Sequence, residues 1–151
     1  MTTSNATTFA TIMFLTGVGI PILAALNGGL GARLGSPMAA SVILFGLAML
    51  IALAGAAVTG SLGDIRLSAE VPAQFYFGGL FVAFYVIAVT FIAPRFGVGN
   101  AIFFVLVGQL ASAAVIDHYG LFGAARFPID AKRVAGIALM IAGVWLARRT
   151  G

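Results

Sequence analysis

The chain has 151 residues, of which 62% are hydrophobic and 8% are charged, and its mean hydropathy is +1.14. Soluble domains average about 45–50% apolar and about 25% charged residues. This composition excludes an ordinary soluble enzyme and indicates an integral membrane protein. The sequence contains no cysteine, which excludes disulfides, thiolate chemistry and cysteine-based metal sites.

Five apolar runs approach the length of about 20 residues that a helix needs to cross the hydrocarbon layer. In chain order they cover residues 8–30, 38–59, 71–93, 98–116 and 134–147. We therefore predict an all-α integral membrane protein with five transmembrane helices, forming a single transmembrane domain over 1–151. The lipid bilayer is its first expected partner.

The first and last apolar runs differ from the others in their flanking residues or their length. The segment before the first run contains no Lys or Arg, and the run is too long for a signal peptide, so we expect a permanent helix there. The last run is short. Lys132, Arg133, Arg148 and Arg149 flank it, and the apolar stems of such residues reach from a helix end to the membrane surface. In the first run, Pro21 predicts either a simple kink or a break that lines a cavity.

The distribution of basic residues predicts how the chain inserts. The sequence pI is about 10.4, but the Lys and Arg residues are scattered between apolar runs, as residues flanking membrane spans are, so we expect no nucleic-acid partner. With five spans, Arg66, Arg126, Lys132 and Arg133 lie on the side of the N-terminus. The other side holds Arg33, Arg95, Arg148 and Arg149.

This even distribution gives no preferred orientation, because the bias of Lys and Arg in short loops sets topology. Two interpretations stay open: a weakly fixed topology, or dual topology in which the chain inserts both ways. Many transporters consist of two inverted repeats around a site at the membrane midplane. The sequence shows no internal repeat. We therefore expect half of an inverted-repeat fold, completed by dimerisation with a second copy in the opposite orientation.

Polar residues inside the predicted spans are candidates for a substrate site, because lipid cannot satisfy them. Five side chains are predicted to line a cavity: Asn27, Ser41, Tyr85, Asn100 and Gln109. For Gln109 and Asn27, a hydrogen bond that holds two helices together is an equal alternative. For Tyr85, ordinary packing is the alternative.

Charged residues are confined to the ends of the spans. Asp117 and His118 form either a proton site or a pair that organises the following loop. Arg33, Arg95 and Arg133 are predicted to act at the mouths, as gates or by attracting an anion, because no Asp or Glu lies in the middle of a span to favour a cation.

The sequence offers little support for catalysis. A single His and no Cys leave few routes to nucleophilic or metal chemistry, and no GxxxxGK phosphate-binding loop is present. We expect no enzyme activity, no cofactor and no metal site.

Short motifs spread over nearly the whole chain carry a family resemblance. They are Asn27 with Gly31, LGSP at 34–37, AS at 40–41, GGL at 78–80, FYV at 84–86, PRFG at 94–97, GQL at 108–110, IDHYGLFG at 116–123, and Arg133 with Gly136. In their order and spacing, the chain resembles the YdcZ-like proteins, a five-helix branch of the drug/metabolite transporter superfamily. Two departures are visible: TGVGIP at 16–21 lacks a Gln that is frequent in the family, and FYF at 75–77 replaces the usual aromatic pair.

The resemblance implies a multi-pass permease or exporter of the bacterial inner membrane that assembles from two five-helix units and carries a small metabolite or drug-like molecule. The leading hypothesis is a secondary transporter that works by alternating access as an antiparallel homodimer with dual topology. The alternatives are a dual-topology channel for small anions, or a non-transporting partner subunit of a heterodimeric transporter.

Overall fold

The computed structural model describes residues 3–147, with side chains from residue 5 onward. All regular secondary structure over that range is helical. Five α-helices follow one another: α1 (Thr3–Leu34), α2 (Pro37–Val58), α3 (Gly78–Phe96), α4 (Val98–Tyr119) and α5 (Ala131–Ala147). Three short 3₁₀ helices lie between them: η1 (Ser61–Asp64), η2 (Ala73–Phe77) and η3 (Leu121–Gly123). The prediction of an all-helical protein is confirmed.

Four segments among the described residues are long and apolar enough to cross a membrane: Asn5–Leu34, Pro37–Val58, Ala73–Phe96 and Val98–Tyr119. The helix α5 is described over 17 residues, which corresponds to about 26 Å at 1.5 Å per residue. The first four predicted crossings therefore have helices of sufficient length, and the crossing by α5 stays a prediction.

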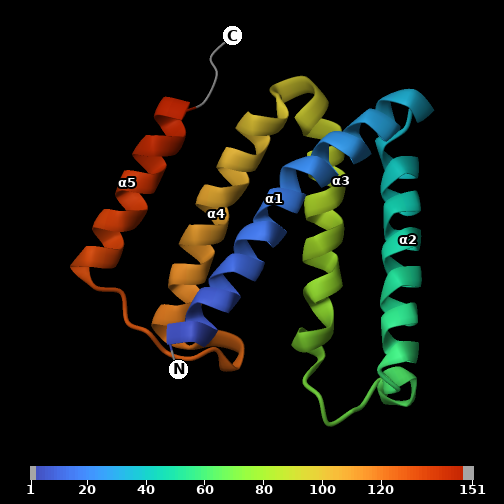
Figure 1. Cartoon of the computed structure of the whole chain (residues 1–151), viewed down its shortest axis with the longest axis horizontal. Coiled ribbons are helices and arrows are strands. Elements are labelled where there is room, and N and C mark those ends of the chain that lie inside the picture. The colour runs from blue at the N-terminus through green and yellow to red at the C-terminus, as the bar shows by residue number, and fades with distance from the viewer. Residues whose placement is uncertain (1–2, 148–151) are drawn as a thin grey trace. The chain divides into compact units, whose positions relative to one another are not determined.

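The chain divides into two compact units, one within residues 1–95 and one within residues 96–151. The first unit contains α1, α2 and α3, and the second contains α4 and α5 (Figure 1). The single domain predicted from the sequence stays a prediction.

A tight turn joins α1 to α2. Gly35 adopts a left-handed conformation (φ 64°), which favours glycine because it has no Cβ. The Ser36 amide donates to the Gly31 carbonyl (3.0 Å), and the Ser36 hydroxyl accepts from the Ala39 amide (3.1 Å). Pro37 follows at the first position of α2, where its missing N–H costs nothing. These bonds satisfy some of the free backbone groups at the end of α1 and the start of α2.

The helix α3 extends beyond residue 93, where the third apolar run was predicted to end. Pro94 lies inside α3, which continues to Phe96, and the chain turns at Gly97 with φ 90°. A proline removes one backbone donor, so the helix can continue past it although the Thr90 carbonyl, four residues earlier, loses its usual N–H partner. The helix α4 likewise continues to Tyr119, so Asp117 lies in its last turn.

Large apolar side chains along the helices are exposed, and the buried hydrophobic residues among the described ones are two Val and five Ala: Ala24, Ala40, Val86, Val89, Ala93, Ala101 and Ala114. Small side chains let helix backbones approach closely, and apolar surface facing outward is stable in lipid. This pattern is that of helices that pack through small residues and expose their large ones to a bilayer.

Candidate functional site

In the first unit, α1 packs against α3 through a buried polar contact. The Asn27 amide nitrogen Nδ2 donates to the Thr90 hydroxyl (2.6 Å), and that hydroxyl donates to the Val86 carbonyl (2.6 Å). Asn27 is 5% exposed and Thr90 1% exposed. Because the hydroxyl has one proton, which it gives to Val86, Asn27 must contribute its nitrogen here. Its amide nitrogen therefore holds two helices together.

Two glycines on α1 make the close approach possible. A Cβ on Gly28 would lie 3.0 Å from Cγ of Pro94, and a Cβ on Gly31 would lie 3.2 Å from Cα of Pro37 and 3.3 Å from Cγ2 of Thr90. These distances are shorter than ordinary van der Waals contacts, so larger residues at these positions would push the helices apart.

These small residues leave a crevice of about 370 Å³, which we call the glycine crevice. Its lining is Gly28, Gly31, Ala32, Gly35, Pro37, Thr90, Pro94 and Arg95. The single charged side chain in this lining is Arg95. The volume lies in the range of sites that hold small molecules.

The Arg95 side chain folds back along α3 onto Phe91, one turn earlier in the same helix. Its guanidinium carbon is 3.9 Å from the centroid of the Phe91 ring, and its Nη1 donates to the Phe91 carbonyl. A guanidinium has five N–H groups, and no other acceptor for them is found among the described residues. Arg95 is therefore held in place with most of its donors free.

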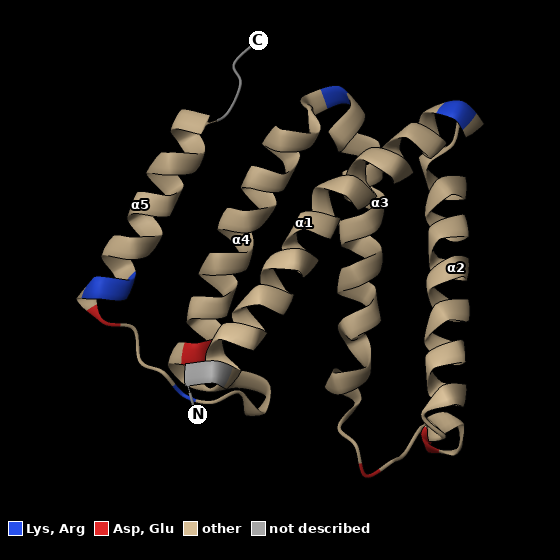
Figure 2. Cartoon of the chain, viewed as in Figure 1, with Lys and Arg blue, Asp and Glu red and all other residues tan. Residues whose placement is uncertain are grey.

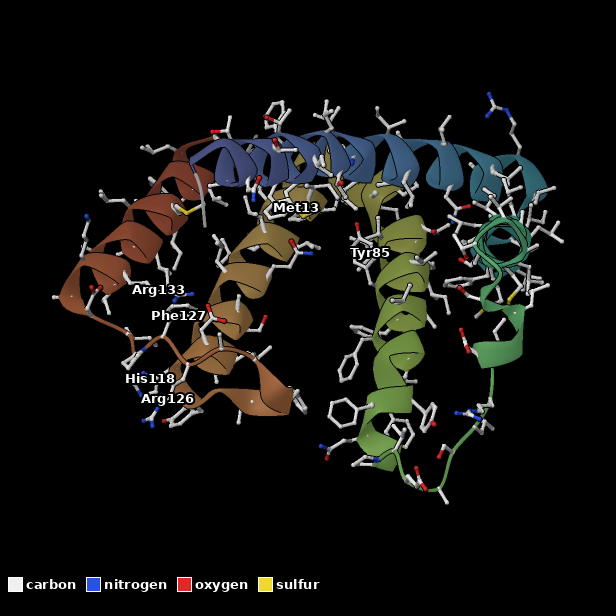
Figure 3. All side chains as sticks on the ribbon, turned by 60° about the horizontal axis from the view of Figure 1, so that its bottom comes forward. Met13, Tyr85, His118, Arg126, Phe127 and Arg133 are labelled. Atoms are coloured by element: carbon white, nitrogen blue, oxygen red, sulfur yellow. The ribbon has the colours of Figure 1, made fainter. Side chains whose placement is uncertain are left out.

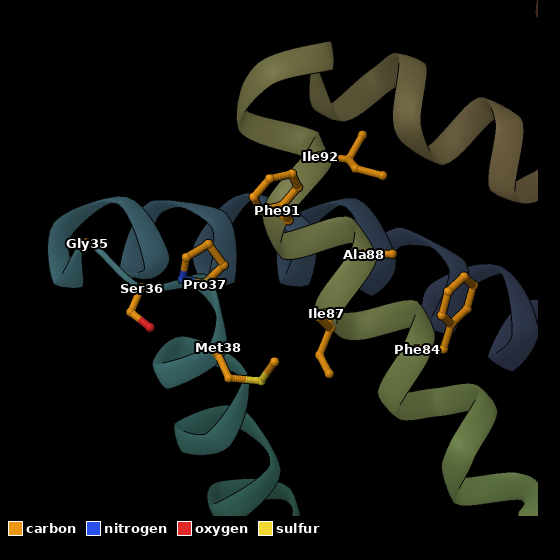
Figure 4. Close-up of a pocket in the computed structure, with 9 residues that line it drawn as sticks. All are labelled: Gly35, Ser36, Pro37, Met38, Phe84, Ile87, Ala88, Phe91 and Ile92. Carbon is orange, nitrogen blue, oxygen red and sulfur yellow. The ribbon is translucent and has the colours of Figure 1, made fainter.

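A second cavity of about 480 Å³ lies beside the first, and we call it the apolar pocket. Its lining is Gly35, Ser36, Pro37, Met38, Phe84, Ile87, Ala88, Phe91 and Ile92. Side chains from the start of α2 face those of α3 across it (Figure 4). Gly35 and Pro37 belong to both cavities.

The other predicted cavity residues of the first unit are Ser41 and Tyr85. The Ser41 hydroxyl is buried and donates to the Pro37 carbonyl (3.0 Å) within α2. The Tyr85 hydroxyl oxygen is buried and has no hydrogen-bond partner among the described residues. Buried polar atoms are nearly always paired, so this hydroxyl is available for a ligand, a water or another chain.

In the second unit, the predicted polar residues of α4 differ in their surroundings. The Asn100 amide donates to the Phe96 carbonyl (3.0 Å) and lines a cavity of about 250 Å³ with Gly97, Gly99, Phe103 and Ala147. The Gln109 side chain is exposed, and the structure records no hydrogen bond from its amide to a described residue. In an apolar helix, such an amide requires a partner from outside the α4–α5 unit.

The residues after α4 form a hydrogen-bonded loop closure around the end of that helix. The Asp117 carboxylate pairs with the Arg133 guanidinium (2.6 Å), and the side chains are 32% and 33% exposed. The Asp117 carbonyl accepts from the Phe127 amide (2.8 Å). His118 accepts from the Ile129 amide at Nδ1 (3.0 Å), and its carbonyl accepts from Arg126 Nε (3.2 Å). His118, in the last turn of α4, and Arg126, on the loop that follows, lie side by side (Figure 3).

Asp130 completes the closure by accepting from the Arg133 backbone amide (2.7 Å) at the start of α5. A carboxylate in this position caps the helix. Asp117 and His118 therefore both take part in organising the 120–133 segment, which is one of the two roles that the sequence left open. Sequence reasoning missed the role of Asp130 as a cap, although Asp before the apolar run of α5 is a recognised helix-start signal.

Metal binding finds no support in this geometry: no group of three His, Asp or Glu side chains that could hold a metal ion is present among the described residues. The long apolar helices and the polar contacts between them define a helical membrane protein. The chain matches, over residues 8–146, the family described as "Putative inner membrane exporter, YdcZ". The chain belongs to this YdcZ family of membrane proteins. No curated protein and no solved structure matches the chain.

Proposed function

We propose that the chain is a secondary transporter that exports a small metabolite or drug-like molecule by alternating access. Membership of the YdcZ exporter family over residues 8–146 is the observation that carries this proposal. Two structural features support it: the buried Tyr85 hydroxyl, which has no partner among the described residues, and the exposed Gln109 amide on an apolar helix. Both are polar groups whose hydrogen bonds must come from a substrate, from water or from other protein.

The second part of the proposal is that the working unit is an antiparallel homodimer of two chains with opposite orientations. The even distribution of Lys and Arg supports dual topology. The small number of buried side chains within one chain leaves extensive helix surface for a second copy. The substrate site would lie near the membrane midplane between the two copies, where inverted-repeat transporters place theirs.

Topology is tested by single cysteines, because the natural chain has none. A cysteine at position 3 in one variant and at position 151 in another, each labelled in intact cells with a membrane-impermeant reagent, should react in about half of the molecules. If each position reacts completely or not at all, the chain has one orientation and the antiparallel homodimer is wrong.

Transport is tested in proteoliposomes that contain the purified chain. A carrier should show saturable uptake and counterflow, in which unlabelled substrate on one side drives labelled substrate inward. Flux that rises linearly with concentration without counterflow contradicts alternating access. The variant Gln109→Met provides an internal comparison, since it removes the amide while keeping an unbranched side chain of similar length.

A further inference from the structure

The glycine crevice and the apolar pocket of the first unit meet at one point. Phe91 lines the apolar pocket, and the guanidinium of Arg95, which lines the crevice, stacks on the same ring at 3.9 Å. Gly35 and Pro37 border both cavities. The Arg95 guanidinium therefore lies directly beside the apolar pocket, and the Phe91 ring is located between them.

The two cavities also differ in depth. Arg95 belongs to the last turn of α3, whereas Phe84 lies eleven residues earlier, about 16 Å along the helix axis. In a membrane-spanning helix, the last turn is near the surface and the earlier turns are in the hydrocarbon layer. The charged end of the combined site therefore faces the membrane surface and the apolar end points into the membrane.

The charges of the first unit favour an anion at this end. Arg33 and Arg95 occupy the last turns of α1 and α3. The connection between α2 and α3, at the other end, carries Asp64, Arg66 and Glu70 and is therefore net negative (Figure 2). Within residues 3–147, one N–H group of Arg95 has an acceptor, the Phe91 carbonyl, and the others have none. Guanidinium donors match carboxylate and phosphate oxygens.

From this arrangement we propose that the two cavities form one binding site for an amphipathic organic anion. Its acidic head group binds Arg95 in the glycine crevice, and its apolar body lies along α3 in the apolar pocket. The Thr90 carbonyl, which has no N–H partner at Pro94, accepts from a hydroxyl or amino group when the ligand carries one. As a statement about the transported substrate, the inference rests on the proposed function; as a statement about binding, it does not.

The binding test uses three ligands of equal size and different charge: 3-phenylpropionate, 3-phenylpropanamide and 3-phenylpropylamine. Calorimetry with the full chain in a neutral maltoside detergent should show tightest binding of 3-phenylpropionate, and acetate should bind weakly because it has no apolar body. Equal or tighter binding of the amide or the amine overturns the proposal.

Two variants locate the site. Arg95→Gln should raise the Kd of 3-phenylpropionate about ten- to hundredfold, the size expected for one charge-assisted contact, and leave the Kd of the amide nearly unchanged. Ala88→Leu should weaken both ligands, because Ala88 lines the apolar pocket and a larger side chain fills it. The matched control is Arg33→Gln, at the same end of the unit but outside both linings. An equal effect of Arg33→Gln and Arg95→Gln overturns the assignment.

Folding and ligand source have their own controls. The unliganded Tm and a monodisperse elution profile establish that each variant is folded, and Arg95→Lys, which keeps the charge, should retain part of the affinity. Nanodiscs of phosphatidylcholine and of phosphatidylglycerol separate two sources of the anion. Competition by phosphatidylglycerol at Arg95 identifies a bilayer lipid, and undiminished binding of 3-phenylpropionate in both lipids identifies a dissolved anion; both results support the anion site.

Counterflow in liposomes separates this inference from the proposed function. Binding that depends on Arg95, without transport of any ligand, leaves the site intact and contradicts the transporter. Saturable counterflow of the amine, unaffected by Arg95→Gln, supports the transporter and contradicts the anion site.

Discussion

The Asn27 amide and the Thr90 hydroxyl meet across α1 and α3 at 2.6 Å, and both side chains are almost completely buried. This hydrogen bond links two positions 63 residues apart in the sequence. It forms at the place where Gly28 and Gly31 let the two helices approach most closely. The polar contact and the glycine packing are therefore parts of one helix–helix interface.

Removing the Thr90 hydroxyl should weaken this interface. Thr90→Val keeps the shape of the side chain and leaves the Asn27 amide buried without its partner, at a cost of about 1–2 kcal/mol. Asn27→Leu, Thr90→Val and the double variant form a cycle that can be measured by denaturation in mixed micelles. The double variant should lose less than the sum of the single variants; strict additivity would show that the bond contributes nothing.

Gly31 should tolerate no larger residue. Gly31→Ala places a Cβ 3.2 Å from the Pro37 backbone, which cannot move without disturbing the α1–α2 turn, and we expect a loss of about 1–3 kcal/mol. Gly29→Ala is the matched control, because its Cβ would meet a described atom only at the end of the flexible Arg33 side chain, at 3.4 Å. That variant should be neutral or slightly stabilising, since alanine favours helix over glycine. Equal losses in both variants would contradict the interface.

Tyr85→Phe should separate burial from ligand binding. The hydroxyl oxygen is buried without a partner among the described residues, so its removal should leave stability unchanged or raise it by up to about 1 kcal/mol. If the hydroxyl contacts the substrate, KM for transport rises although the protein is as stable as before. A large loss of Tm would instead reveal a structural hydrogen bond to a group outside the described chain.

The Asp117–Arg133 ion pair should contribute modestly to the attachment of α5. Both side chains are about one-third exposed, and pairs with such solvent access contribute about 0–1 kcal/mol. Asp117→Ala should increase proteolysis within residues 120–130, as should Arg133→Ala. Exchanging the two residues, Asp117→Arg with Arg133→Asp, tests the pairing: proteolysis of the exchanged chain should fall below that of either single replacement.

His118 should act through its Nδ1 atom. This atom accepts from the Ile129 amide at 3.0 Å, and the side-chain oxygen of Asn occupies a similar position, whereas that of Gln extends further. We therefore expect His118→Asn to retain slow hydrogen exchange at Ile129 and His118→Ala to lose it, with an increase in exchange rate of about tenfold for a loss near 1.4 kcal/mol. Fast exchange at Ile129 in both variants would show that another contact of the ring matters.

Sequence patterns predicted the helical class and most helix positions, because apolar runs bounded by Gly, Pro and charged residues are local signals. Helix ends were predicted less accurately. The α-helical part of the third run begins at Gly78 and not at 71, since Pro72 is followed by the 3₁₀ helix Ala73–Phe77. At its other end, α3 continues to Phe96, beyond the predicted end at 93, and the chain turns at Gly97, which adopts positive φ.

At the candidate site, the sequence predicted which residues are polar but not which contacts they make. The sequence identified Asn27 and Tyr85 as polar residues inside apolar helices, but could not distinguish an amide that binds another helix from a hydroxyl without a partner. It also placed Arg95 at a membrane surface, but it did not predict that the guanidinium stacks on Phe91. The Asn27–Thr90 hydrogen bond and the burial of the Tyr85 hydroxyl both depend on how α3 lies in the first unit. The position of α3 in turn depends on small residues of α1, which are distant in the chain.

The sequence by itself determined that this is a helical membrane protein with charges at the ends of its apolar helices, because hydrophobicity and charge act over short stretches of chain and need no knowledge of neighbours. The tertiary structure alone decided that Thr90 pairs with Asn27, that Gly31 lies against Pro37, and that Arg95 lies at the junction of two cavities. These relations depend on close contacts between residues of separate helices, which no local pattern specifies.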